Sequence, residues 1–202
     1  EGDMQLAVSD MDIYENLTPR VLESRRQLLD GSQVVVLDTN LPSESIQWVA
    51  ENCRAPIFAD PVSTAKAEKL RPVLGKLHTL KPNRLETELL SGVPITDDDS
   101  LCRAADALLE TGLHRVFISL GADGVFAADH SGQKRKLPAL KGNIVSTTGC
   151  GDAFMAALAW AYLQGSDLEK SARAGRAAST VTMASAETIS AAMSEQALLA
   201  HM

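Results

Sequence analysis

The amino-acid sequence predicts an α/β protein with a mostly parallel β-sheet. From about residue 33 onward, short apolar runs alternate with amphipathic stretches, a pattern typical of strand–helix repeats. A continuous β-branched run lies at residues 33–38, and alanine-rich stretches at residues 152–164 and 167–183 predict two helices. With 202 residues, 45% of them hydrophobic, the chain is long enough to bury one sizeable core or two small ones.

The first third of the chain supplies the expected outer elements and the first strands. Residues 4–10 alternate loosely between apolar and polar side chains and predict an edge or lid strand. Thr18 followed by Pro19 is typical of a helix start. Residues 33–38 predict a central strand that is buried on both faces. The next elements are a helix that Ser43 caps and that runs through Ala50, a strand at residues 56–60, and a helix from Thr64 towards Leu70.

The second part continues the alternation of strands and helices. Glycines mark most of the predicted stops. The elements are, in order, a strand at residues 77–80, a helix through residues 85–90 that ends at Gly92, a helix from Asp98 or Asp99 through Leu109 with Gly112 as its stop, paired strands at residues 115–120 and 124–128, a strand at residues 134–140, and the two alanine-rich helices.

Composition and charge exclude several classes of partner. No segment reaches the roughly 18 to 20 apolar residues of a membrane-spanning helix, and the first residues lack the pattern of a signal peptide. The 19 basic and 26 acidic residues give a net charge of −7, which disfavours a nucleic-acid polymer. We therefore expect neither a membrane nor a nucleic-acid partner.

The cysteines and the chain start carry information about context. Cys53, Cys102 and Cys150 are odd in number and match no zinc or disulfide framework, so we expect a reducing cytoplasm. The sequence opens on Glu1 without an initiator Met, and we expect it to be a segment of a longer product.

The most informative stretch is residues 146–154, with the sequence STTGCGDAF, at the entrance of an alanine-rich helix. Gly149 and Gly151 allow backbone N–H groups to approach an anion closely, and the helix dipole adds partial positive charge there. Asp152 places a carboxylate beside the same point, where it could accept a proton from an attacking hydroxyl. A purely structural explanation also stands, because the dipole favours Asp in a first helical turn and glycine loops often only turn.

Two better-known glycine loops do not match this stretch. A Walker loop needs Lys followed by Ser or Thr after its last glycine, whereas Asp152 and Ala153 follow Gly151 here. A dinucleotide fingerprint needs a third small residue where Phe154 stands. Nicotinamide binding is therefore disfavoured.

Residues 81–86, with the sequence KPNRLE, form a second constellation. Asn83 lies at a strand end, and Glu86 follows three residues later, so both side chains reach the first turn of a helix. Together they could hold hydrated Mg²⁺ or order water around phosphates. The alternative is a capping box, since Asn followed by Glu three residues later is its signature.

Residues 119–124, with the sequence SLGADG, form the third constellation. Gly121 and Gly124 turn the chain between two predicted strands, and Ser119 ends the first of them. A hairpin turn explains this stretch by itself, so a nucleotide-binding role depends on support from the other two constellations.

These three motifs, in this order and spacing, resemble the ribokinase, or pfkB, family of carbohydrate and nucleoside kinases. The similarity runs over essentially the whole chain. Within the family, residues 2–4, 9–13, 38–42 and 60–66 look most like the pseudouridine kinase branch.

The resemblance implies a three-layer αβα fold and ATP-dependent phosphorylation of the 5′-hydroxyl of pseudouridine or a related nucleoside. ATP would be the co-substrate and Mg²⁺ the cofactor. The implied roles are Asp152 as catalytic base, the amides of Gly149, Cys150 and Gly151 as anion hole, Asn83 and Glu86 as organisers of Mg²⁺ through water, and Ser119, Gly121 and Gly124 as lining of the nucleotide site. Two alternatives stay open: a kinase for a sugar such as ribose or fructose, and a non-catalytic nucleotide-binding fragment.

The sequence departs from the family pattern in two respects. Ser146 stands where many members have Asp, which puts activation by a monovalent cation in doubt. The family's N-terminal portion, with its sugar-binding motif and most of its lid, has no counterpart here. We therefore expect residues 1–12 to be a lid-strand remnant and residues 13–202 to be the C-terminal portion of the fold. A homodimer through the lid is expected for the full-length protein, and the fragment alone is expected to lack turnover.

Overall fold

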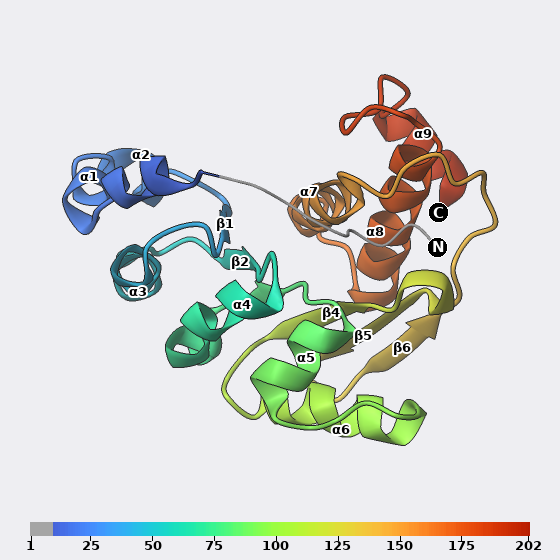
Figure 1. The fold of residues 1–202 in the computed structure, drawn as a ribbon, viewed down its shortest axis with the longest axis horizontal. Helices are drawn as coiled ribbons and strands as arrows, with labels where there is room; N and C mark the ends of the chain where they lie inside the picture. The colour runs from blue at the N-terminus through green and yellow to red at the C-terminus, as the bar shows by residue number, and fades with distance from the viewer. Residues whose placement is uncertain (1–9) are drawn as a thin grey trace.

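The computed structural model describes residues 10–202, and these residues contain one six-stranded sheet with strand order β1-β2-β3-β4-β5-β6 (Figure 1). The first four strands pair in parallel, and the last two pair antiparallel to their neighbours. The strands are β1 (Val35–Asp38), β2 (Ile57–Asp60), β3 (Thr79–Leu80), β4 (Arg115–Ser119), β5 (Val125–Asp129) and β6 (Lys134–Leu137). The predicted α/β class with a mostly parallel sheet is confirmed.

Helices connect the parallel strands and complete the C-terminal part of the chain. Short 3₁₀ helices, labelled η, accompany the α-helices. In chain order the helices are η1 (Asp12–Asn16), α1 (Pro19–Glu23), α2 (Arg26–Asp30), α3 (Ser43–Asn52), α4 (Thr64–Ala67), η2 (Glu68–Lys76), α5 (Arg84–Ser91), α6 (Asp98–Leu109), η3 (Gly121–Asp123), α7 (Cys150–Leu163), α8 (Leu168–Met183) and α9 (Glu195–His201).

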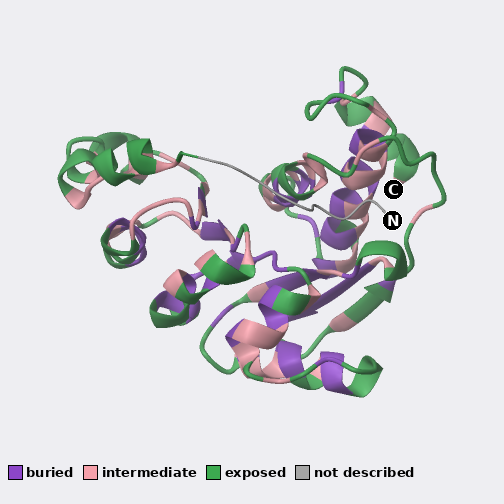
Figure 2. Cartoon of the chain, viewed as in Figure 1, coloured by how far each residue is buried: buried purple, intermediate pink, exposed green. Residues whose placement is uncertain are grey.

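The sheet is the middle of three layers because alternate side chains of its strands face opposite sides. In β4, Val116 and Ile118 pack with the helices α3, η2, α5 and α6, while Phe117 packs with α7 and α8. Burying Phe117 fully contributes about 1.5 to 3 kcal/mol. Figure 2 shows the resulting pattern, with buried central strands and exposed α1 and α2.

Small residues bring α7 and α8 into close contact. A Cβ on Gly175 of α8 would lie 2.3 Å from the ring of Phe154 of α7, so only glycine fits there. Near the start of α7, the Ser179 hydroxyl donates to the Cys150 carbonyl oxygen at 3.1 Å. These contacts fix the position of the first turn of α7 against α8.

The first predicted strand differs from expectation. The sequence predicts a central strand, but β1 lies at the edge of the described sheet, and Val36 is 51% exposed. Only Leu37 of this strand is buried. Within residues 10–202 the β-branched run is therefore an edge strand with one exposed side chain, rather than a central strand buried on both faces.

Smaller differences concern element ends. Ser43 is the first residue of α3 rather than its cap, and Pro42 occupies the cap position. The strand predicted at residues 77–80 is limited to Thr79–Leu80.

The lid strand predicted at residues 4–10 falls almost entirely on residues 1–9, which lie outside the described residues. Of the predicted lid remnant at residues 1–12, the described part begins at Asp10, and Asp12 opens η1. No helix within residues 10–202 is long and apolar enough to cross a membrane.

Candidate active site

The three sequence constellations meet at the carboxyl ends of the parallel strands. The backbone N–H of Ser119 donates to the Pro82 carbonyl oxygen at 2.9 Å, and Asn83 and Ser119 form a parallel bridge. Lys81 links this pair to α7, because its Nζ lies 3.4 Å from the place where a Cβ on Gly151 would be. This edge is where ligands bind in open α/β sheets.

The entrance of α7 requires glycine at its first position. Gly149 is the N-cap with φ +84°, and a Cβ there would lie 2.3 Å from the Thr188 carbonyl oxygen. Both the backbone conformation and the space therefore exclude other residues. Gly151 has no such backbone restriction, but its missing side chain keeps the helix entrance open towards Lys81.

Backbone donors are available at this helix entrance. Within the described residues, the N–H groups of Gly149, Gly151 and Asp152 find no hydrogen-bond acceptor. The N–H of Cys150 is engaged with the Thr147 carbonyl oxygen at 3.3 Å. The structure therefore leaves the Gly149 and Gly151 amides of the predicted anion hole free, together with the unpredicted Asp152 amide, while Cys150 has an internal partner.

Asp152 presents an exposed carboxylate in the first turn of α7. No described residue forms a hydrogen bond or an ion pair with this carboxylate. It could therefore accept a proton from a hydroxyl group that approaches the same entrance.

Cys150 has a packing role in the described structure. Its Sγ lies 3.6 Å from the Ser179 carbonyl oxygen, and burial raises the pKa of the thiol. A raised pKa disfavours the thiolate, so the residue does not have the character of a reactive cysteine.

The second constellation forms the capping box that the sequence allowed. The Asn83 side chain accepts from the Glu86 N–H at 2.9 Å, and Glu86 Oε2 accepts from the Asn83 N–H at 2.8 Å. Glu86 is only 3% exposed. Burial raises the pKa of its carboxyl, the Asn83 N–H lowers it, and Asp60 and Lys81 add smaller opposing effects. The capping box uses only Oε2 of the Glu86 carboxyl. The role of this side chain in holding Mg²⁺ through water stays a prediction.

The charged side chains around Glu86 fit a hydrated Mg²⁺ better than a metal ion that the protein ligates directly. Asp60 and Glu86 carry two carboxylates beside the single ammonium of Lys81, which leaves excess negative charge. Within residues 10–202, no group of three or more His, Cys, Asp or Glu side chains is arranged to hold a metal ion. A cation here would therefore depend on water and phosphate oxygens for most of its ligands.

The third constellation contains one structural glycine and one open glycine. Gly124 has φ +93°, and a Cβ there would lie 2.0 Å from the Leu137 carbonyl oxygen. Gly121 has φ +60° and open space around its Cβ position. Gly124 is therefore explained by packing, while Gly121 leaves room for a ligand to approach the turn.

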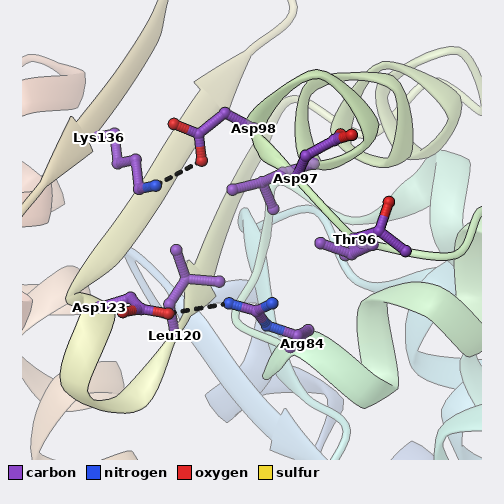
Figure 3. Close-up of a pocket in the computed structure, with 9 residues that line it drawn as sticks. Arg84, Thr96, Asp97, Asp98, Leu120, Asp123 and Lys136 are labelled. Atoms are coloured by element: carbon purple, nitrogen blue, oxygen red, sulfur yellow. Dashed lines mark hydrogen bonds and ion pairs between the residues drawn. The ribbon is translucent and has the colours of Figure 1, made fainter.

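A cavity of about 220 Å³ lies beneath this turn (Figure 3). Two ion pairs cross it: Arg84 with Asp123 at 3.1 Å, and Lys136 with Asp98. These pairs tie the turn and β6 to α5 and α6. Because each of these four charged side chains has an opposite partner, none of the four is left unpaired for a ligand.

Sequence reasoning missed two charged residues at the site. Lys81 and Asp60 are largely buried and form an ion pair, with Lys81 Nζ 2.9 Å from Asp60 Oδ2. Both residues follow or end a parallel strand, so the rule that ligands bind at carboxyl strand ends could have identified them.

The fold and the site define a three-layer α/β protein in which unpaired backbone N–H groups and an exposed carboxylate lie at a helix entrance, at the carboxyl edge of the sheet. The family model described as pfkB family carbohydrate kinase matches residues 6–195. The chain belongs to this family, as the sequence motifs predict.

Known relatives agree with this assignment. The chain is 36% identical to the pseudouridine kinase of Escherichia coli strain K12 over 183 residues. This alignment covers 90% of the chain and 58% of the relative. A putative sugar kinase from Clostridium perfringens is 33% identical with a TM-score of 0.89, covering 98% of this chain and 63% of that one. Arabidopsis thaliana ribokinase, solved with ribose and ATP, shares the fold at 20% identity with a TM-score of 0.76, covering 88% of this chain and 58% of that one.

The chain thus spans about three fifths of the length of these relatives. The three-layer ribokinase-like fold predicted from the sequence is confirmed for this portion.

Proposed function

We propose that this chain belongs to an ATP-dependent kinase that phosphorylates the 5′-hydroxyl of pseudouridine or a related nucleoside. The observation that carries the proposal is the unpaired Asp152 carboxylate beside the free amides of the α7 entrance. A pure anion-binding site gains nothing from a negative charge next to the anion, whereas phosphoryl transfer needs a proton acceptor there. The 36% identity to a pseudouridine kinase supports this acceptor.

In the proposed reaction, the acceptor hydroxyl gives its proton to the Asp152 carboxylate while its oxygen attacks the γ-phosphorus of ATP. The new oxygen–phosphorus bond forms as the bond between the γ-phosphorus and the β,γ-bridging oxygen breaks, and ADP leaves. The N–H groups of Gly149 and Gly151 donate to the phosphoryl oxygens that carry the developing charge. The Cys150 amide can join them by giving up its long bond to Thr147.

The remaining predicted residues hold the nucleotide. Ser119, Gly121 and Gly124 would line its binding site at the turn after β4. Asn83 and Glu86 would hold Mg²⁺ through water, and the cation would neutralise phosphate charge. A homodimer through the lid and a cytoplasmic location remain predictions, while Ser146, at a position where many members have Asp, argues against activation by a monovalent cation.

A sugar acceptor is the second candidate, and the 33% identity to a putative sugar kinase favours it. A panel of nucleosides and sugars, tested with ATP and Mg²⁺ on the full-length protein by ADP release, separates the two. Pseudouridine should support the highest kcat/KM. A higher kcat/KM for ribose or fructose would identify a sugar, and not a nucleoside, as the acceptor.

Asp152→Asn tests the proposed base in the same full-length protein. Turnover should fall by about 10² to 10⁴-fold, while ATP affinity should change little because the base acts in the transition state. Asp167→Asn is the matched control, since Asp167 caps α8 through a hydrogen bond from the Lys170 N–H that Asn can also accept. Unchanged turnover of a folded Asp152→Asn variant would remove Asp152 from the mechanism.

A further inference from the structure

Lys81 is a buried lysine whose ammonium group lies at the entrance of α7. The residue is 6% exposed, and its Nζ is 2.9 Å from Asp60 Oδ2. The same Nζ lies 3.4 Å from the place where a Cβ on Gly151 would be. The ammonium therefore faces the helix entrance across the space that glycine leaves open.

The ammonium has donors that the protein does not use. A lysine ammonium carries three N–H donors, and in the described part of the chain Asp60 is the one acceptor that Nζ finds. Buried donors without acceptors cost free energy, unless a ligand or water supplies the missing oxygens. An anion bound beside Gly151 would supply them.

The position of the ammonium is fixed from the other side by Asp60. Asp60 Oδ1 accepts from the Val62 N–H at 2.9 Å while Oδ2 holds Lys81. Val62 has φ +62°, which is rare for a β-branched residue. The carboxylate is thus bound to a specific turn after β2, and the turn sets where the lysine lies.

We propose that Lys81 is a catalytic residue that donates hydrogen bonds to the γ-phosphoryl oxygens of bound ATP, with Asp60 as its positioning residue. This inference rests on the proposed function. During transfer the acceptor hydroxyl proton goes to Asp152 and the γ-phosphoryl group leaves ADP, while Lys81 keeps its proton. Its positive charge stabilises the charge on the transferring oxygens, which lie between the α7 amides and Asp152.

The test compares a non-hydrolysable ATP analogue with ADP, both with Mg²⁺, by calorimetry on the 202-residue chain. Lys81→Met should weaken binding of the analogue about 10- to 100-fold, the effect of losing a charged hydrogen bond. Binding of ADP, which lacks the γ-phosphoryl group, should change less than about twofold. This difference between the two nucleotides is a readout that a general loss of structure would not produce.

Two further variants keep the test decisive. Lys81→Met leaves Asp60 buried without its partner and can destabilise the fold. The double variant Asp60→Asn with Lys81→Met removes both charges and should show the same selective loss for the analogue. Lys134→Met is the matched control, because it also breaks a lysine–aspartate pair, with Asp106 at 2.7 Å, but far from the α7 entrance. It should bind both nucleotides normally.

The outcomes separate this inference from the proposed function. If the unmodified chain binds both nucleotides, but the Lys81 variants lose both equally or lose neither, the role of Lys81 is overturned and the nucleotide site stands. If the unmodified chain binds neither nucleotide, the proposed nucleotide site is contradicted, and the inference fails with it.

Discussion

The two edges of the sheet differ in how their polar side chains are satisfied. At the amino edge, His78 precedes β3, His114 precedes β4 and His130 follows β5. The rings of His78 and His114 stack with centroids 5.5 Å apart, and the rings of His114 and His130 are tilted with centroids 4.9 Å apart. Phe58 and Tyr162 pack against His78 at 5.3 and 4.8 Å. The His78 ring also hydrogen-bonds the Thr79 hydroxyl at 2.9 Å, whereas His114 and His130 are exposed to solvent.

The carboxyl edge leaves several polar groups without protein partners. The N–H groups of Gly149 and Gly151, the Asp152 carboxylate and two donors of Lys81 are available to a ligand within the described structure. The two edges are separated by only the two residues of β3, between His78 and Lys81. The comparison teaches that a cluster of titratable side chains is a weak sign of function by itself. Unpaired donors and acceptors at a fixed position are the stronger sign.

Among variants that change the shape of the site, the largest effect is expected from closing the carboxyl edge. Gly149→Ala in the full-length protein should lower turnover by about 10² to 10³-fold, because the anion hole cannot keep its geometry. The Cβ would clash with the Thr188 carbonyl oxygen, and the positive φ adds about 1 to 2 kcal/mol of strain. Activity assays beside a melting curve measure both effects.

Gly165→Ala is the control for this change. Gly165 also has a positive φ, +66°, but its Cβ position is open. This variant should lose about 1 kcal/mol of stability and keep its turnover. Equal loss of turnover in both variants would mean that general destabilisation, and not the site, is responsible.

A smaller effect is expected at Glu86. Glu86→Gln should raise the Mg²⁺ concentration for half-maximal rate about tenfold, since groups that orient a hydrated metal contribute 10- to 100-fold. Burial raises the pKa of this carboxyl, and a Gln side chain can still accept from the Asn83 N–H, so Glu86→Gln should not lower stability. Mg²⁺ titration and thermal melting test the two statements.

Asp167→Asn is the comparison variant for Glu86, because Asp167 caps α8 through the Lys170 N–H and does not line the cavity beneath the turn after β4. It should leave the Mg²⁺ response unchanged. An unchanged Mg²⁺ response of Glu86→Gln would assign Glu86 to capping alone, because Gln can still accept from the Asn83 N–H.

The amino edge should respond to pH and not to substrate. Burial, together with the positive charges of Arg115, His114 and His130, lowers the pKa of His78 to about 4. A group whose folded pKa lies below its unfolded value of about 6.5 contributes stability at higher pH, and this contribution is lost as the pH falls from about 6.5 towards 4. His78→Phe should remove up to about one proton from this pH dependence and leave nucleotide binding at neutral pH unchanged. Melting curves across this pH range measure the change in stability. If His78→Phe loses stability with falling pH as the unmodified protein does, another group is responsible for the pH dependence.

The sequence predicted most elements because their signals are local. The capped helix starting after Asn83, its stop at Gly92 and the turn at residues 121–123 all follow from short-range chemistry. The edge position of β1 could not be predicted in this way, because which strands pair with a β-branched run is a property of the whole sheet.

The candidate site was predictable in part for the same reason. The glycines and Asp152 stand in one recognisable stretch, whereas the ion pair of Asp60 with Lys81 joins residues 21 positions apart that the parallel pairing of β2 and β3 brings together. The free amides also depend on where the residues 141–149 segment lies against Thr188, which local patterns do not encode.

The central claim is that the carboxyl edge of this sheet binds ATP. Hydrogen–deuterium exchange of the 202-residue chain, with and without a non-hydrolysable ATP analogue and Mg²⁺, tests it most directly because it locates the ligand. We expect slower exchange at residues 147–153 and 119–124, with no change around His78, His114 and His130. Protection at the histidine edge, or no protection anywhere at saturating analogue, would contradict the claim.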